Sequence, residues 1–274
     1  MTFTDRCKSA WHLNDSLLCV GLDPEADRLP DAFLGMPPLA AIESFCQEIV
    51  RSTAPFCAAF KPQVAHFSSI GAEPVLERIC RFIRENHPDH LLILDAKRAD
   101  IGSTALHYAA EAFDRYQADA VTINPYLGTD SIEPFLRRPD KGIFVLCRTS
   151  NPGGDDLQMQ TLASGKRLYE HVAQMAAQTW NRHGQVGLVV GATYPSEVRI
   201  VRQHAIDLPL LVPGIGVQGG DLPQTVHAAA TPDGGLFLNS SRAILYASPK
   251  EDWLGAAVEV ARQTHEAIVN ARGQ

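Results

Sequence analysis

The sequence lacks several features that mark other classes of protein. It has no apolar run of the roughly 20 residues that a membrane-spanning helix needs. The segment from Met1 to Ser16 is polar and mixed, without the basic stretch and apolar core of a signal peptide. The net charge of −7 argues against general attraction to nucleic acid or to an anionic membrane. We therefore expect a cytoplasmic protein with no nucleic-acid or membrane partner.

Motifs for metals and dinucleotides are also missing. The chain has six cysteines but no C-x-x-C pair, and its ten histidines are scattered without ligand spacing, so we predict no metal site. Most of the cysteines lie in apolar runs, and we interpret them as core residues of a protein in a reducing compartment. No G-x-G-x-x-G follows the first apolar run, where the sequence is Gly21-Leu22-Asp23-Pro24. This absence argues against a dinucleotide-binding loop.

What the sequence does contain is a regular alternation of two patterns. Short apolar, β-branched runs are typical of parallel strands buried on both faces, and they recur at 17–23, 57–63, 91–97, 120–125, 142–150, 186–193, 208–214 and 234–241. Helical spacing lies between them, in stripes at Ile42, Phe45, Cys46 and Ile49, at Val75, Ile79, Phe82 and Ile83, and at Leu168, Val172, Met175 and Ala176, with a last helix over 250–271. Eight such units predict an α/β protein with one (β/α)8 TIM barrel domain over residues 1–274 and a short extension before the first strand. A doubly wound open sheet is the alternative.

Charged residues interrupt three successive apolar runs near their ends. Asp23 ends the first run, Lys61 lies near the end of the second, and Asp95 and Lys97 close the third. The carboxyl ends of the strands form the active-site floor in such a barrel, and residues two apart on a strand share a face. We expect the four side chains to lie within reach of one another, with Lys97 kept protonated by its neighbours. A purely structural ring of salt bridges is the alternative.

Glycines and an arginine follow the last two runs. The seventh leads into the glycine-rich segment 213–221, and the eighth leads into Ser241-Arg242. Glycine lets the backbone approach an anion closely, and the loops after strands seven and eight are the usual phosphate site of the barrel. The guanidinium of Arg242 supplies a local positive charge to an acidic protein. This pattern predicts a phosphate site, whereas the longest irregular stretch, Asn151–Gly165, indicates a lid or binding loop.

These residues resemble the orotidine 5′-phosphate decarboxylase family, from the first strand to the eighth. The sharpest part is the segment 95–104, Asp-Ala-Lys-Arg-Ala-Asp-Ile-Gly-Ser-Thr, which is similar to the family's D-x-K-x-x-D signature in the form of its longer bacterial subgroup. Supporting matches lie at 21–23, 60–62, 149–153, 213–221 and 241–242. The chain departs from the pattern at Ser241, where the family often has glycine, and at Arg98, where many relatives are apolar. The sequence does not place the side chain of Arg98.

The resemblance implies a decarboxylase without cofactor or metal, which converts orotidine 5′-phosphate (OMP) to uridine 5′-phosphate (UMP) and CO2 in the last step of de novo UMP synthesis. Lys97 would donate a proton to the carbon that loses CO2, with Asp95 beside the substrate carboxylate. Lys61 and Asp23 would hold the ribose hydroxyls. Asp100 would take part in catalysis by helping to hold the lysine.

The resemblance also implies contacts at the two ends of the substrate. Ser150 would bind the pyrimidine edge, and Gln218 and Arg242 would hold the phosphate, with Gln218 bridging toward the base. Asp100 and Thr104 would reach into the active site of a second subunit, which implies a homodimer. The other substrate-binding residues expected in the phosphate loops are Pro213, Gly219 and Ser241.

Two other functions fit parts of the pattern. Sugar-phosphate aldolases and ketogulonate phosphate decarboxylases share a similar Asp-x-Lys-x-x-Asp element but use Mg²⁺, which Asp23 and Asp95 could bind. A barrel that only binds a nucleotide phosphate is the second. Gln218 and Ser150 favour a nucleotide over a sugar phosphate, and the intact set of lysines and aspartates favours catalysis.

Overall fold

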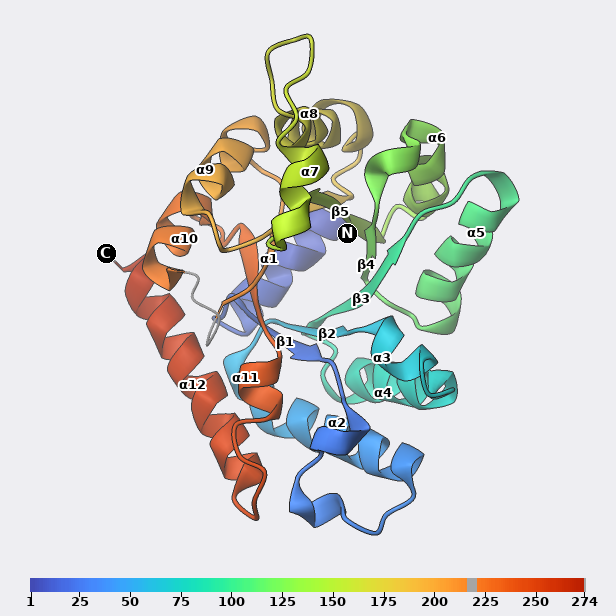
Figure 1. Cartoon of the computed structure of the whole chain (residues 1–274), viewed down its shortest axis with the longest axis vertical. Coiled ribbons are helices and arrows are strands. Elements are labelled where there is room, and N and C mark those ends of the chain that lie inside the picture. The colour runs from blue at the N-terminus through green and yellow to red at the C-terminus, as the bar shows by residue number, and fades with distance from the viewer. Residues whose placement is uncertain (216–220, 274) are drawn as a thin grey trace.

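The centre of the molecule is a closed barrel of eight parallel strands in the order β1 to β8 (Figure 1). The computed structural model describes residues 1–215 and 221–273. Parallel pairing runs around the whole circle, and β1 closes the barrel against β8. This confirms the predicted (β/α)8 barrel and excludes the open sheet. The strands are β1 Leu18–Leu22, β2 Ala59–Pro62, β3 Leu91–Arg98, β4 Ala120–Ile123, β5 Gly142–Arg148, β6 Val186–Val190, β7 Leu210–Pro213 and β8 Leu236–Ser240.

Most of the strands are shorter than the apolar runs that predicted them. Strands β1 and β6 are buried at every position, because side chains fill the barrel on one face and helices cover the other. Asp23 lies one residue beyond β1, and Ser150 lies two residues beyond β5. The residues predicted to carry chemistry therefore stand at or just past the carboxyl ends of the strands.

Helices form a ring around the barrel (Figure 1). None of the helices in the described part of the chain combines the length and apolar content that crossing a membrane requires. The α-helices are α1 Phe3–Leu13, α2 Pro38–Thr53, α3 Val64–Ser68, α4 Glu73–Asn86, α5 Gly102–Ala110, α6 Thr129–Ile132, α7 Asp155–Gln158, α8 Leu168–Met175, α9 Pro195–His204, α10 Leu222–Ala229, α11 Arg242–Leu245 and α12 Trp253–Arg272.

The predicted helical stripes differ in how well they mark the buried face. The stripe of α2 is fully buried, and in α4 only Phe82 is partly exposed. The stripe predicted around α8 was partly right: Ala176 is buried and Val172 and Met175 pack against the core while half-buried, but Tyr169 and Ala173, outside the stripe, are buried as well. A small residue such as Ala173 lets the helix approach the barrel closely, so the buried face extends beyond the predicted stripe.

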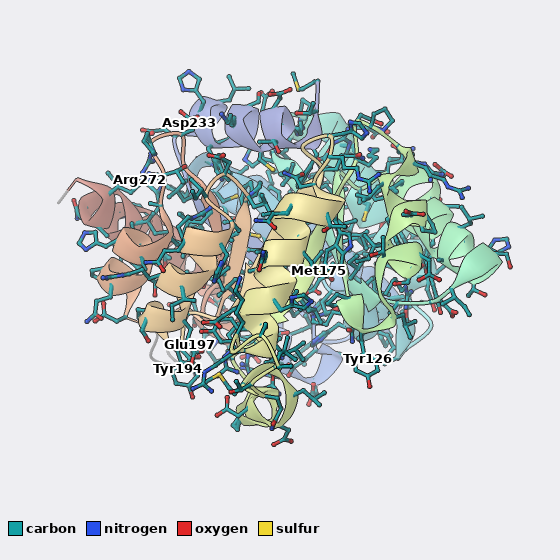
Figure 2. The ribbon with its side chains drawn as sticks, turned by 90° about the horizontal axis from the view of Figure 1, so that it is seen from above. Tyr126, Met175, Tyr194, Glu197, Asp233 and Arg272 are labelled. Atoms are coloured by element: carbon teal, nitrogen blue, oxygen red, sulfur yellow. The ribbon has the colours of Figure 1, made fainter. Side chains whose placement is uncertain are left out.

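The extension before the first strand is a helix that covers the amino end of the barrel. Helix α1 starts with a capping box between Thr2 and Asp5. Its Phe3 ring lies edge-on to Phe144 of β5 with centroids 5.6 Å apart. Figure 2 shows α1 at the same end as Asp233, opposite the end that carries Tyr126, Tyr194 and Glu197. The carboxyl end is therefore the open one.

We expect Phe3→Ala to lower the free energy of unfolding by about 3–4 kcal/mol, because it leaves a cavity beneath the barrel. The matched control is Leu13→Ala on the same helix, whose side chain is exposed and should change stability little. Urea denaturation followed by circular dichroism measures both. Equal losses for the two variants would mean that α1 contributes no specific packing at this end.

Candidate active site

A cavity of about 710 Å³ opens at the carboxyl end of the barrel. Its walls come from strand ends on both sides of the barrel, so one cavity connects the charged residues after β1–β3 with the loops after β7 and β8. Ser150 contributes to its lining from the end of β5. The residues predicted from the sequence that line it are Asp23, Lys61, Asp95, Ser150, Pro213, Ser241 and Arg242.

The four charges predicted to meet do lie together. The Nζ of Lys97 donates a hydrogen bond of 2.7 Å to Asp95 Oδ1, and the Nζ of Lys61 donates one of 2.8 Å to Asp95 Oδ2. Asp23 Oδ1 lies 3.9 Å from Lys61 Nζ and has no hydrogen-bond partner within the described residues. The carboxylate of Asp95 is thus shared by two ammonium groups.

Burial and charge act in opposite directions on the pKa values of this cluster. Burial alone would raise the pKa of Asp95, but the charges of Lys61 and Lys97 outweigh it and hold that pKa well below its usual range. Burial would likewise lower the pKa of Lys61, yet Asp95 and Asp23 raise it above that of a free lysine. Asp95 and Lys61 therefore both stay ionised at neutral pH.

A threonine that the sequence analysis missed organises the end of β3. The backbone N–H groups of Ala96 and Lys97 donate to Thr122 Oγ1 at 3.0 and 2.9 Å. Thr122 Oγ1 in turn donates to Asp95 Oδ1 at 2.8 Å. The register between β3 and β4 shifts here, and Lys97 takes a φ of +48°. Such left-handed backbone is unfavourable for lysine and persists where surrounding bonds impose it.

Asp100 and Thr104 do not line the cavity of their own chain. Asp100 Oδ1 accepts a hydrogen bond from the N–H of Ile101, and Thr104 is exposed in the first turn of α5. Lys97 is also absent from the lining, although its Nζ is bonded to Asp95. Lys97 and Thr104 are exposed, and Asp100 is half-buried.

The side chain of Arg98, which the sequence left unplaced, packs along α5. Its Nε and Nη2 each donate a 3.0 Å hydrogen bond to the carboxylate of Glu111. The guanidinium also lies 4.7 Å from the centroid of the Tyr108 ring. Arg98 therefore ties β3 to the helix that follows Asp100.

On the opposite side of the cavity, the loops after β7 and β8 bring glycine-containing backbone close to the segment that carries Arg242. A Cβ added at Gly21 would lie 1.8 Å from Ser241 Oγ, so only glycine lets β1 approach this loop. Gly214 has a φ of +96°, a conformation that favours glycine. Arg242 starts α11, is exposed, and makes no ion pair within the described residues. The predicted Gln218 and Gly219 lie outside the described residues.

Tyr246 and Arg28 also line the cavity and were not predicted. The Tyr246 hydroxyl donates to the carbonyl of Asp23 at 3.2 Å and accepts from the N–H of Glu25 at 2.7 Å. The guanidinium of Arg28 lies 4.1 Å from the centroid of the Tyr246 ring. These contacts join the loop after β1 to the end of α11, and they add a second arginine to the cavity wall.

Comparisons with known proteins agree with this geometry. Residues 16–256 match the model of the orotidine 5′-phosphate decarboxylase / HUMPS family. The chain is 57% identical over 269 residues to the orotidine 5′-phosphate decarboxylase of Cupriavidus necator and 56% identical over 270 residues to that of Bordetella pertussis, with 98% of each chain covered. Its fold matches the structure of Leishmania donovani OMP decarboxylase with a TM-score of 0.85 and 39% identity, over 100% of both chains.

We expect Lys61→Met to lower the free energy of unfolding by about 3 kcal/mol at pH 7, because it leaves Asp95 buried with one ammonium group fewer. The folded pKa of Lys61 is raised, so its contribution is complete below about pH 10.4 and declines only as the pH rises further. The difference in the free energy of unfolding between the unmodified chain and Lys61→Met should be constant from about pH 6 to pH 9. Urea denaturation at several pH values measures it.

The control is Lys8→Met, because Lys8 forms an ion pair of 2.7 Å with Asp233 on the exposed surface. Exposed pairs contribute little, so this variant should be far less destabilised. A loss for Lys61→Met no larger than that of the control would contradict the assigned strength of the buried cluster.

Proposed function

Since the chain belongs to the orotidine 5′-phosphate decarboxylase / HUMPS family and decarboxylates OMP to UMP and CO2, the last step of de novo UMP synthesis, we propose that Lys97 protonates the carbon that loses CO2. The observation that carries this role is the 2.7 Å bond from its ammonium to Asp95, which lines the cavity. That bond fixes a positive charge at the end of β3 without burying the lysine itself.

The substrate spans the cavity from β3 to β8 in this proposal. Its carboxylate lies beside Asp95, its ribose hydroxyls bind Asp23 and Lys61, and its phosphate binds the loops that carry Pro213, Ser241 and Arg242. The hydrogen-bonding capacity left at Asp23 Oδ1 and the absence of an ion pair to Arg242 within the described residues support these assignments. Ser150 contacts the pyrimidine edge, and Gln218 and Gly219 are proposed to complete the phosphate site.

Loss of CO2 leaves a carbanion that has no obvious electron sink in the pyrimidine ring. The site must then stabilise the transition state by roughly 20 kcal/mol, toward the upper end of what enzymes achieve. A fixed ammonium near the developing charge supplies electrostatic stabilisation and then the proton. The phosphate contacts are remote from the reacting carbon, so their binding energy is available to close loops over the substrate.

The partners of Asp95 favour this chemistry over a magnesium-dependent one. Each of its carboxylate oxygens already accepts a hydrogen bond from an ammonium group. A divalent cation at Asp95 would have to displace Lys61 or Lys97 and would be repelled by the other. The arrangement therefore supports Asp95 as the partner of two lysines and not as a metal ligand.

A homodimer with shared active sites is the second part of the proposal. Asp100 and Thr104 lie outside their own cavity and are proposed to enter that of the other subunit. Large apolar side chains are exposed nearby. Ile101 directly follows Asp100, and Tyr126 and Leu127 lie in the segment after β4. Exposed apolar residues grouped at one rim support a contact surface there. Tyr126 stands out at that end of the barrel in Figure 2.

We also propose that the protein acts in the cytoplasm. All six cysteines are free and buried. Burial raises the pKa of the Cys46 thiol and of the Cys147 thiol, which makes thiolate formation unfavourable. Unpaired cysteines of this kind suit a reducing compartment.

We expect Lys97→Met to lower kcat for OMP by at least about 1000-fold, because both the fixed charge and the proton donor are lost. Binding of UMP should be weakened much less, because the phosphate contacts remain. A spectrophotometric assay of OMP and calorimetric titration with UMP measure the two effects, with Lys8→Met as the control. Near-full turnover by Lys97→Met would exclude this lysine as the proton donor.

Mixing two inactive variants tests the shared sites. Lys97→Met and Asp100→Asn should each be strongly impaired alone. After unfolding and refolding together, they should regain about a quarter of the unmodified activity, because half of the dimers are hybrids with one intact site each. A mixture that stays as inactive as its components would place Lys97 and Asp100 in the same subunit's site.

A further inference from the structure

A buried arginine at the end of β5 takes no part in the chemistry described above. The side chain of Arg148 is only 3% exposed. Its Nε donates to Glu197 Oε2 at 2.5 Å, and its Nη2 donates to Asp155 Oδ1 at 2.6 Å. A permanently charged group is costly to bury, and these two carboxylates offset that cost. Arg148 stands two residues before Ser150, which lines the active-site cavity.

One side of the guanidinium holds the loop that follows β5. Arg148 Nη1 lies 3.3 Å from Gln158 Oε1. The same Oε1 accepts a 2.8 Å hydrogen bond from the backbone N–H of Thr149, and Gln158 Nε2 donates one of 2.8 Å to the Thr149 hydroxyl. Gly154 packs on this group, since a Cβ there would lie 2.9 Å from Arg148 Nη1. Residues 149–158 are therefore folded back onto Arg148.

The other side of the guanidinium holds the loop after β6. Glu197 lies in the first turn of α9, and the ring of Tyr194 lies 5.2 Å from Arg148 Cζ. Figure 2 shows Tyr194 and Glu197 next to each other at the carboxyl end of the barrel. The carbonyl of Arg148 also accepts a 2.7 Å hydrogen bond from Gly191, where an added Cβ would lie 2.8 Å from the Cβ of Ser150. Ser150 is thus confined between two loops that Arg148 joins.

We propose that Arg148 is a positioning residue that sets the orientation of Ser150 toward the pyrimidine. This inference rests on the proposed contact between Ser150 and the base. Only the planar fork of arginine can bond Asp155, Glu197 and the Gln158 amide at once, because a lysine ammonium is a single point charge. Arg148 then joins the loops after β5 and β6 into one unit. The position of Ser150, and with it the base-binding half of the cavity, depends on that unit.

The test distinguishes an effect on contacts with the base from an effect on contacts with the phosphate. Arg148→Met is compared with the unmodified protein for its affinity toward UMP and toward ribose 5-phosphate, both measured by calorimetry. We expect UMP binding to weaken at least about tenfold, since base contacts are lost. Ribose 5-phosphate should bind within about twofold of the unmodified protein, because the phosphate loops lie on the far wall. Equal weakening of both ligands, or of neither, would overturn the proposal.

Two further variants keep the test decisive. Arg148→Lys should recover only a minor part of the UMP affinity, and full recovery would mean that charge alone suffices. If Arg148→Met does not fold, Asp155→Asn provides the comparison, because Asp155 is largely exposed and its loss should weaken UMP binding selectively but less.

Ser150→Ala distinguishes failure of this inference from failure of the proposed contact. If Ser150 binds the base, Ser150→Ala weakens UMP binding, and adding Arg148→Met to it causes little further loss. An unchanged UMP affinity in Ser150→Ala would remove the contact itself. A normal effect of Ser150→Ala with no effect of Arg148→Met would remove only the role of Arg148.

Discussion

The carboxylate of Asp95 sits between two ammonium groups, and the arrangement of the site depends on that pairing. Because Lys61 and Lys97 each bond one oxygen, the carboxylate keeps its charge in a buried position and holds both lysines in place. Thr122 adds a hydrogen bond to the same carboxylate and fixes the backbone of Lys97. The unusual backbone of Lys97 is thus held by its surroundings.

An acidic protein that acts on a phosphorylated, carboxylated substrate has an electrostatic problem. The net charge of −7 repels such an anion at long range. Positive charge in the cavity counters this repulsion locally, because Arg28 and Arg242 line one part of its wall and Lys61 lines another. Of these three side chains only Lys61 is buried, which strengthens its interactions with the carboxylates of Asp23 and Asp95, whereas Arg28 and Arg242 are exposed. In the proposed binding mode, contacts with the phosphate supply binding energy that can be used at the opposite wall of the cavity.

Buried charges recur around the rim and have different tasks. Asp95 holds Lys61 and Lys97, whereas Arg148 joins two loops through Asp155 and Glu197. The opposite end of the barrel combines the aromatic contacts of α1 with polar ones, such as the two 2.9 Å hydrogen bonds from Arg84 to the buried Asp119. This division matches the general separation of the barrel into a catalytic end and a stabilising end.

The sequence alone determined the strands, their order of occurrence and the charged residues at their ends. These follow from local rules, because apolar runs mark buried strands and residues two apart share a face. The inner face of α8 was predicted only in part, because Tyr169 and Ala173, which lie outside the predicted stripe, are buried too. Which residues of α8 face the barrel was decided by the elements that pack against the helix and not by the helix's own apolar pattern.

Only the tertiary structure decided which polar groups meet. Thr122 reaches Asp95 across 27 residues, Glu197 reaches Arg148 across 49, and Tyr246 reaches the backbone of Asp23 across 223. Each of these contacts depends on strand register and on closure of the barrel, which bring distant segments side by side. A threonine in a β-branched run is indistinguishable by sequence pattern from a strand former, because its function arises only from the carboxylate that the neighbouring strand places beside it.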